Sequence, residues 1–196
     1  MPSTYVPLNA TLGFKASPVN GLWFNIFGGY RISKDELFCN LVDADGYYFT
    51  HFLQDKAKTA YGGAELKYGY KDWFDASLKG TFYSWKTDNE NEELYLMTKP
   101  KFELNFYAEA KVFEGLKVYL GYEYVQRKEY VIEEGNSSRD LGLGNISNLS
   151  VGASYTFLKD LSVFGRVNNL LNKQYYYEYG YPAEKLNVLA GLSLVF

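Results

Sequence analysis

The amino-acid sequence predicts an all-β protein, an antiparallel up-and-down transmembrane β-barrel segment of about nine to ten strands. Three observations favour this fold class. Apolar and polar residues alternate with the two-residue period of a strand along most of the 196 residues. The links between the alternating runs are alternately short and long. Aromatic residues make up 19% of the chain, and many of them, Trp85 included, gather toward the ends of the runs, as in the interfacial girdles of membrane barrels.

The alternating runs follow one another with no convincing helical period between them. The cleanest run is Lys101–Phe113, where apolar Phe102 and Leu104 alternate with Glu103 and Asn105. The predicted strands cover residues 8–14, 22–31, 59–70, 74–85, 101–113, 116–127, 149–157, 161–167 and 186–196. The segment 32–58 is the link most open to another interpretation, because its two arms can simply extend the flanking strands.

The connections show a regular asymmetry. Short ones lie near residues 15–21, 71–73, 113–115 and 158–160, and long ones near 32–58, 86–100, 131–145 and 168–185. In an up-and-down sheet this order places every tight turn at one end and every long loop at the other. Short periplasmic turns and long extracellular loops are typical of outer-membrane barrels.

One face of the predicted strands carries charges of both signs. If the turn at 71–73 pairs Tyr70 with Phe74, Glu65 lies opposite Lys79, which is a favourable cross-strand pair. Mixed charges at mid-strand suit a polar lumen and are costly in a dry interior. The predicted lumen-facing charges are Glu65, Lys67, Lys79, Glu103, Glu109, Lys111 and Glu123. A soluble β-barrel or sandwich with its aliphatic face inside is the alternative, since alternation alone does not distinguish inside from outside.

The composition excludes several classes of site. The net charge of −3 argues against nucleic acid as a partner. The single Cys39 and single His51 exclude an intrachain disulfide and a multi-histidine metal site. No run is long and apolar enough for a membrane helix, and the N-terminus shows no signal peptide. The chain is therefore expected to be cytosolic, mature or a piece of a longer protein.

No cofactor, metal or catalytic site is expected. The pattern Asp43-Ala44-Asp45-Gly46 matches part of a calcium loop, but it lacks the distal carboxylates, and a hairpin tip explains it better. The acidic run 88–93 is interpreted as a solvated loop. His51 has no identifiable nucleophile and carboxylate partners, so the protein is predicted not to be an enzyme.

The closing stretch carries a specific motif. Val167, Asn169, Leu170, Lys173 and Tyr175 stand in a segment that resembles V-x-N-L-[LF]-[DN]-K-x-Y, found near the end of TonB-dependent receptors, where a final strand ending in Phe follows. Leu186–Phe196 fills that place. The tyrosine-rich style resembles receptors of the Bacteroidetes type. The resemblance implies a receptor and transporter in the outer membrane of a Gram-negative bacterium, taking up a scarce ligand such as a siderophore, vitamin or glycan.

The resemblance also implies partners. These are outer-membrane lipid, the barrel assembly machinery that reads Phe196 as a C-terminal signal, and the TonB complex, which the receptor contacts only through a plug domain that this chain lacks. On the long-loop side, tyrosines are candidates for stacking on a ligand, although packing within the loops is the alternative. These candidates are Tyr47, Tyr48, Tyr177, Tyr179 and Tyr181.

The strand count departs from that of the family, whose barrels have about 22 strands. With Phe196 on the periplasmic side, counting back through the predicted strands puts residue 8 on the extracellular side. A complete bacterial barrel has an even strand number and a periplasmic N-terminus. Residues 1–196 are therefore expected to form a single β-barrel domain that is the C-terminal part of a larger barrel. The alternative is a small self-contained outer-membrane porin or structural barrel, in which the first and last strands pair.

Overall fold

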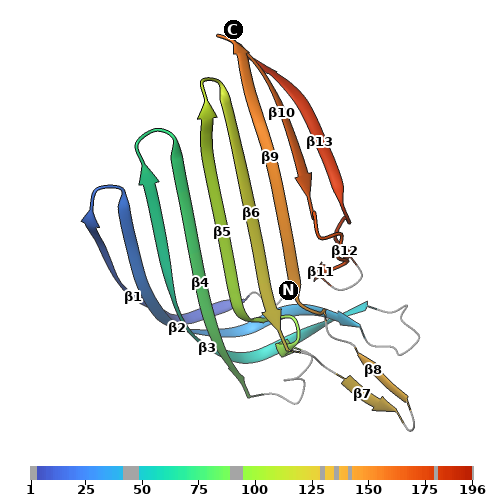
Figure 1. Cartoon of the computed structure of the whole chain (residues 1–196). Helices are drawn as coiled ribbons and strands as arrows, with labels where there is room; N and C mark the ends of the chain where they lie inside the picture. Colours follow the sequence, from blue (N-terminus) through green and yellow to red (C-terminus); the bar gives the residue numbers. More distant parts are fainter. Residues whose placement is uncertain are drawn as a thin grey trace.

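The computed structural model of the chain describes residues 4–41, 49–88, 95–128, 131–134, 137–140, 143–178 and 181–195. Within these residues, nine strands form one antiparallel sheet, in which they lie side by side in the order in which they occur along the chain (Figure 1). They are β1 (Tyr5–Val19), β2 (Leu22–Leu41), β3 (Phe49–Tyr70), β4 (Phe74–Thr87), β5 (Pro100–Phe113), β6 (Leu116–Arg127), β9 (Ile146–Leu158), β10 (Leu161–Asn168) and β13 (Asn187–Leu194). The predicted all-β, up-and-down architecture is confirmed.

Four short strands lie outside the main sheet. They form two hairpins, β7 (Val131–Glu134) with β8 (Ser137–Asp140), and β11 (Tyr176–Glu178) with β12 (Tyr181–Pro182). The main sheet is open: β1 and β13 stand at the two ends of its strand order, and the pairings within the described residues do not join them. Both edges of the sheet therefore present unpaired backbone groups. No helix in the described ranges is long and apolar enough to cross a membrane.

The tight turns gather at one end of the sheet, here called the turn end, together with the C-terminus (Figure 1). Two of them depend on glycine, because Gly21 and Gly115 have φ angles of 81° and 83°. A side chain at Gly21 would also collide with the backbone of Gly69, whose amide donates to the Gly21 carbonyl oxygen at 2.7 Å. The opposite end, here called the long-loop end, carries the longer connections, as the sequence predicts.

The segment 32–58 is mostly strand. Strands β2 and β3 pair continuously from Leu22 opposite Tyr68 to Leu41 opposite Phe49, so the two arms extend the flanking strands. The link shrinks to residues 42–48, which lie outside the described residues together with the tip at Asp43–Gly46. Alternation weakens in these arms because part of their surface is covered by other segments of the chain. Ala57 is fully buried there.

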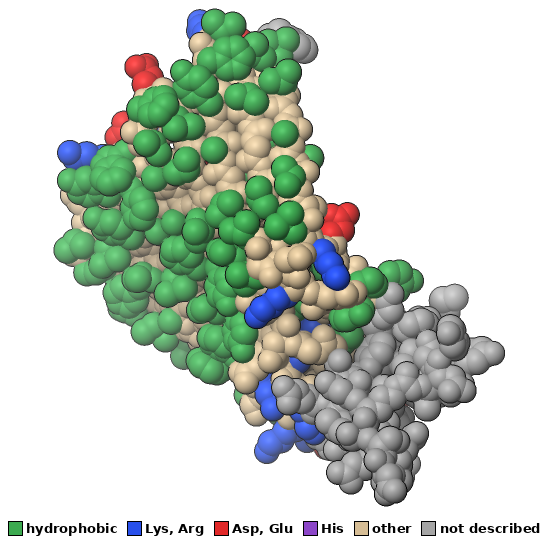
Figure 2. Space-filling model, turned by 45° about the vertical axis from the view of Figure 1, so that its right-hand side comes forward, with side chains coloured by type: hydrophobic (Ala, Val, Ile, Leu, Met, Phe, Trp, Pro, Cys, Tyr) green, Lys and Arg blue, Asp and Glu red, His purple; other side chains and the backbone are tan. Residues whose placement is uncertain are grey.

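Strand register assembles one continuous apolar face. A single row of register partners crosses from β2 to β13 and is apolar apart from one tyrosine hydroxyl: Leu22, Tyr68, Ala76, Ala108, Leu120, Val151, Val167 and Val188. Large side chains on this face are exposed, with Leu12 at 83% and Phe82 at 65% of full accessibility. Figure 2 shows hydrophobic side chains covering one broad side of the sheet. A continuous exposed apolar area of this size marks a surface that interacts with another apolar surface or with a membrane.

Two bands of aromatic side chains border the apolar face. At the turn end Tyr70 meets Trp73 edge-to-face, with ring centroids 5.6 Å apart, and Phe113 contacts Tyr155. At the long-loop end Phe82 contacts Phe102 at 4.4 Å, and Phe102 contacts Tyr124 at 6.3 Å. Along β4 the bands are separated by the eight positions from Phe74 to Phe82. At about 3.4 Å per residue and a tilt of roughly 40°, this is about 20 Å, close to the height of a membrane barrel's apolar band.

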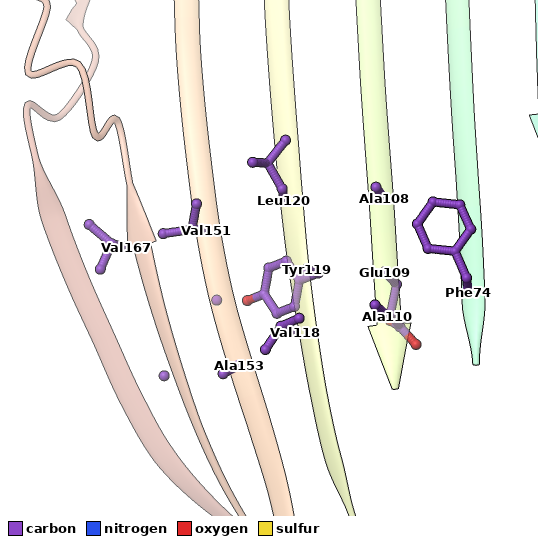
Figure 3. A pocket seen from close by; sticks show the side chains of 12 residues that line it. Phe74, Ala108, Glu109, Ala110, Val118, Tyr119, Leu120, Val151, Ala153 and Val167 are labelled. Carbon is purple, nitrogen blue, oxygen red and sulfur yellow. The ribbon is translucent and has the colours of Figure 1, made fainter. Parts of the chain in front are cut away.

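A shallow hollow of about 620 Å³ interrupts the apolar face between β4 and β10 (Figure 3). Small residues, Ala108, Ala110 and Ala153, leave this space between the larger Phe74 and Val118. The one charged residue in its lining is Glu109, whose carboxylate is already bonded to Lys117 and to the Tyr107 hydroxyl. The rest of the lining is almost entirely apolar, so the hollow suits hydrocarbon better than a polar ligand.

The buried hydrophobic residues lie at the long-loop end. Among the described residues they are Ala57, Tyr95, Met97, Val125, Leu143, Ile146 and Tyr175. Two clusters contain most of them: Ala57 with Tyr95, and Val125 with Ile146 and Tyr175. Each cluster forms where a loop folds back onto the sheet, so the middle of the sheet has no packed core on either face.

Candidate ligand-facing site at the long-loop end

The second face of the sheet, here called the polar face, collects the charges predicted to line a lumen. Glu65 is the register partner of Lys79, as the sequence predicts, and the same row continues to Glu123. Alternate residues of a strand point to the same face of the sheet, a relation here called strand parity. Strand parity puts the other predicted members on this face as well, and these are Lys67, Glu103, Glu109 and Lys111. The structure thus brings all seven residues together on one face. That this face lines a lumen stays a prediction.

Several of these charges are paired within the sheet. Lys67 contacts Glu65 at 3.0 Å, and Lys117 contacts Glu109 at 2.8 Å. The carboxylate of Glu103 accepts a hydrogen bond from the Tyr83 hydroxyl at 2.8 Å. Pairing of this kind allows a charged surface to persist in a channel of limited hydration, because each ion keeps a partner.

Residues 95–99, here called the first inward turn, fold onto the polar face of β2, β3 and β4. The carboxylate of Glu36 holds this turn: it accepts hydrogen bonds from the Tyr95 hydroxyl at 2.9 Å and from the Lys99 ammonium at 2.6 Å. The Ser33 hydroxyl donates to the same carboxylate at 2.9 Å. Tyr95 is fully buried and packs against Ala57. The turn therefore closes part of the polar face with a charged cluster.

The electrostatics of this cluster keep Glu36 ionised. Burial alone would raise the pKa of Glu36, but the hydrogen bond and charge of Lys99, with the hydroxyls of Ser33 and Tyr95, hold that pKa below its ordinary value. Burial, followed by the charge of Glu36, raises the pKa of Tyr95. Tyr95 therefore stays a hydrogen-bond donor.

Residues 169–178, here called the second inward turn, fold onto the polar face of β6 and β9. Asn169 organises it with φ of 50° and only 1% exposure. Its side-chain amide donates to the Lys173 carbonyl at 2.7 Å and to the Glu184 carbonyl at 3.1 Å, and its oxygen accepts from the Lys173 amide at 3.2 Å. Asparagine tolerates this left-handed conformation better than most residues. The bonds explain why the motif places asparagine here.

The second inward turn is fixed to the sheet by further contacts. The Arg127 guanidinium donates to the Tyr176 carbonyl at 2.6 Å, and the Tyr177 hydroxyl donates to Glu123 at 2.7 Å. Tyr175 is 6% exposed and packs against Val125. Burial, followed by the bond to Glu123, raises the pKa of Tyr177, so its hydroxyl stays protonated. Tyr175 and Tyr177 therefore serve the attachment of the loop.

A hollow of about 270 Å³ lies beside the first inward turn. Its walls include Tyr83 and Trp85, whose rings stack at 6.0 Å with a 22° angle between planes. Lys99, Lys101 and Lys128 complete its rim. Stacked rings beside ammonium groups can hold a ligand that has a flat part and an anionic part. This hollow is therefore a candidate polar site at the long-loop end.

Of the five tyrosines predicted to contact a ligand, two belong to the described residues and three do not. Tyr177 is attached to Glu123, and Tyr181 is 73% exposed at the hairpin β11–β12. Tyr47, Tyr48 and Tyr179 lie outside the described residues, as does Phe196, the predicted assembly signal. Of the motif residues, Val167 lies in the apolar row, Leu170 is 42% exposed, and the Lys173 backbone bonds to Asn169. A role for the tyrosines in binding stays a prediction.

Other sequence candidates gain no support as sites. His51 lies in β3 opposite Cys39, and nothing is described of its side chain. Of the acidic run, Asp88 is described and pairs with Lys58 at 3.5 Å. In the described ranges no three His, Cys, Asp or Glu residues are grouped to hold a metal ion.

The sequence does not predict the first inward turn or Glu36, the residue that holds it. Trp85 falls among the aromatic residues expected in a girdle, but strand parity puts it on the polar face, where its indole N–H donates to the Pro100 carbonyl at 2.7 Å. Glu36, Tyr95 and Lys99 show no local signal, because they come from segments that fold together only in three dimensions.

Comparison with solved structures identifies the architecture. The chain matches the ferripyoverdine receptor of the outer membrane of Pseudomonas aeruginosa with a TM-score of 0.67 and 15% identity over 95% of this chain and 26% of that one. It matches a ferric enterobactin receptor of the same organism with a TM-score of 0.65 and 18% identity, over 96% and 31% of the two chains. The ferric-catecholate import receptor Fiu of E. coli gives 0.66 and 14%, over 96% and 27%.

These neighbours are TonB-dependent receptors, and the match falls on their barrel. The fold of this chain is that of part of the barrel of these receptors. It spans less than a third of the length of each of these receptors. No protein-family model matches the chain, and no curated protein matches it. The fold resemblance therefore agrees with the motif at Val167–Tyr175, and both relate to the receptor barrel.

Proposed function

We propose that this chain forms the C-terminal part of the barrel of a TonB-dependent outer-membrane receptor that imports a scarce ligand. The observation that carries the proposal is the open nine-stranded sheet, which matches receptor barrels over 95% of its own length but only 26% of theirs. Unpaired strand edges are not tolerated in lipid. Further strands of the same barrel, pairing with β1 and β13, satisfy both edges.

In this proposal the two faces have separate tasks. The apolar face and its aromatic bands meet lipid, and the polar face lines the lumen through which the ligand passes. The long-loop end is extracellular, and the hollow beside Trp85 belongs to the vestibule where the ligand first binds. Energy comes from the inner-membrane TonB complex through a plug domain outside the residues of this chain. The ligand is a small molecule or glycan, and one structural neighbour, PirA of Pseudomonas aeruginosa, is named a siderophore receptor.

The arrangement of the strand edges can be tested by cross-linking. In the polypeptide that carries this chain, with Cys39→Ser as background, single cysteines replace Leu12 in β1 and Val188 in β13, both exposed on the apolar face. In a larger barrel these strands are far apart, and we expect no intramolecular disulfide under mild oxidation. A control pair at Val163 and Leu192, which are register partners, should cross-link.

Two outcomes would contradict the proposal. Efficient cross-linking of Leu12→Cys with Val188→Cys would mean that the sheet closes on itself, as in a small self-contained porin. Recovery of the protein as a monomer from the soluble fraction, without detergent, would mean that the apolar face is not adapted to lipid. The proposed receptor should instead fractionate with outer membranes and require detergent for extraction.

A further inference from the structure

Four lysines lie on the apolar side of the sheet just beyond the aromatic band of the long-loop end. Lys34 is the register partner of Lys56, and Lys58 is the register partner of Lys86. Register continues without a shift from these positions to the apolar Ala60 and Ala64, so strand parity puts the lysines on the same side as the apolar face. Lys34, Lys56, Lys58 and Lys86 are called the lysine patch below.

The height of the lysine patch matches the edge of a membrane's hydrocarbon region. Ten positions separate Tyr70, at the turn end of β3, from Ala60. With about 3.4 Å per residue and a tilt of roughly 40°, this is about 25 Å, the height of the apolar band of an outer-membrane barrel. Lys58 is the next residue on that side of β3. In Figure 2 basic side chains follow the lower border of the hydrophobic side of the sheet.

The lysine patch is not neutralised within the described part of the chain. Asp88 contacts Lys58 at 3.5 Å and Lys56 at 3.9 Å, and it is the one carboxylate recorded there in ion pairs with these lysines. Like charges placed opposite each other destabilise neighbouring strands. Among the described residues, the four lysines therefore outnumber the one carboxylate that pairs with them, and an external anion would stabilise this local charge.

We infer that the lysine patch binds the phosphate-bearing head groups of lipids in the membrane leaflet at the long-loop end, while their acyl chains lie on the apolar face below. The inference rests on the proposed membrane orientation. Charge complementarity and continuity with the apolar face favour a lipid over a free anion, because only a lipid satisfies both surfaces at once. Basic residues at this level each strengthen the attraction of anionic lipid.

The test uses the polypeptide that carries this chain, purified in a neutral detergent. Phosphatidylglycerol and phosphatidylcholine with identical acyl chains are titrated separately, and bound lipid is counted by native mass spectrometry. We expect the wild-type protein to prefer phosphatidylglycerol by about tenfold, as several basic residues at the surface predict. The triple variant Lys34→Gln, Lys58→Gln, Lys86→Gln should lose this preference. It retains Lys56 as the partner of Asp88, which protects the fold.

A matched control removes the same number of charges from the polar face, with Lys15→Gln, Lys79→Gln and Lys111→Gln. These lysines lie on the opposite side of the sheet, so the control should keep the preference of the wild-type protein. Equal preference in the wild type and the patch variant would overturn the inference, as would displacement of the lipid by inorganic phosphate at the same concentration. A protein that binds neither lipid and stays monomeric without detergent would instead contradict the proposed function.

Discussion

The first and second inward turns both fold back onto the polar face at the long-loop end, but different chemistry attaches them. The first depends on one charged group, the Glu36 carboxylate, which binds Tyr95 and Lys99. The second is organised internally by a neutral amide, Asn169, which bonds to backbone groups of its own loop, and Arg127 and Tyr177 then join it to the sheet. The first should therefore respond to pH and to loss of one charge, whereas the second should respond to the geometry of one residue.

Replacing Asn169 should have the largest effect. Asn169→Ala removes three hydrogen bonds and leaves two carbonyls and one amide without their partner. It also places alanine at a φ of 50°. At about 1 kcal/mol for each lost bond and a further 1 kcal/mol or so for the left-handed backbone, the second inward turn should lose about 3–4 kcal/mol. Hydrogen exchange of the detergent-purified protein should accelerate in residues 169–186 and not in 95–99.

Asn172 supplies the control for this variant. It has a similar φ of 52°, but its side chain is exposed and accepts one hydrogen bond, from the Leu186 amide. Asn172→Ala should therefore cost clearly less than Asn169→Ala. If the two variants exchanged at equal rates, the burial and bonding of Asn169 would not be what holds the loop.

The same comparison shows what the sequence could predict. The second inward turn carries a recognisable motif because its bonds are local: Asn169 and Lys173 are four residues apart. The first is invisible in the sequence, because Glu36 binds residues 59 and 63 positions away. Strand alternation predicts the register of Glu65 with Lys79 correctly, since a period of two fixes which side chains share a face.

Alternation fails where the environment of a face changes along one strand. Trp85 follows the girdle pattern in sequence, yet it lies on the polar face because the first inward turn supplies an apolar partner there. Likewise, the arms at 32–58 look irregular because they are extended strands that leave the apolar band and meet other parts of the chain. The pattern thus reports the surroundings of each segment, and it weakens where other parts of the chain cover the sheet.

The second prediction concerns the charge of Glu36. Glu36→Gln keeps the shape of the side chain but removes the ion pair with Lys99, whose ammonium lies 2.6 Å from the carboxylate. Since both side chains are only about one-fifth exposed, the first inward turn should lose about 1–2 kcal/mol. Exchange should accelerate in residues 95–99, while the second inward turn is unchanged. Asp88→Asn, which breaks more exposed pairs with Lys56 and Lys58, should cost less than about 0.5 kcal/mol.

The third and smallest effect is that of acidic pH on the attachment of the first inward turn. The pKa of Glu36 in the folded protein lies below its ordinary 4.5. A carboxylate with a lowered folded pKa contributes stability that is complete above the unfolded value and is lost as pH falls through the folded one. The first inward turn should therefore keep its full attachment from neutral pH down to the ordinary pKa of a glutamate, and it should loosen only at more acidic pH, as Glu36 becomes protonated. Hydrogen exchange, corrected for its intrinsic pH dependence, measures this directly.

Glu36→Gln provides the decisive control for the pH effect, because its amide does not titrate. The variant should show a first inward turn that is already weakened at neutral pH and does not loosen further as the solution is acidified. The Asn169 amide is likewise neutral throughout, so the three hydrogen bonds that it makes should persist over the same pH range. A transition that persists in Glu36→Gln would assign the acid sensitivity to another carboxylate, and the contrast between a charged and a neutral attachment would not hold.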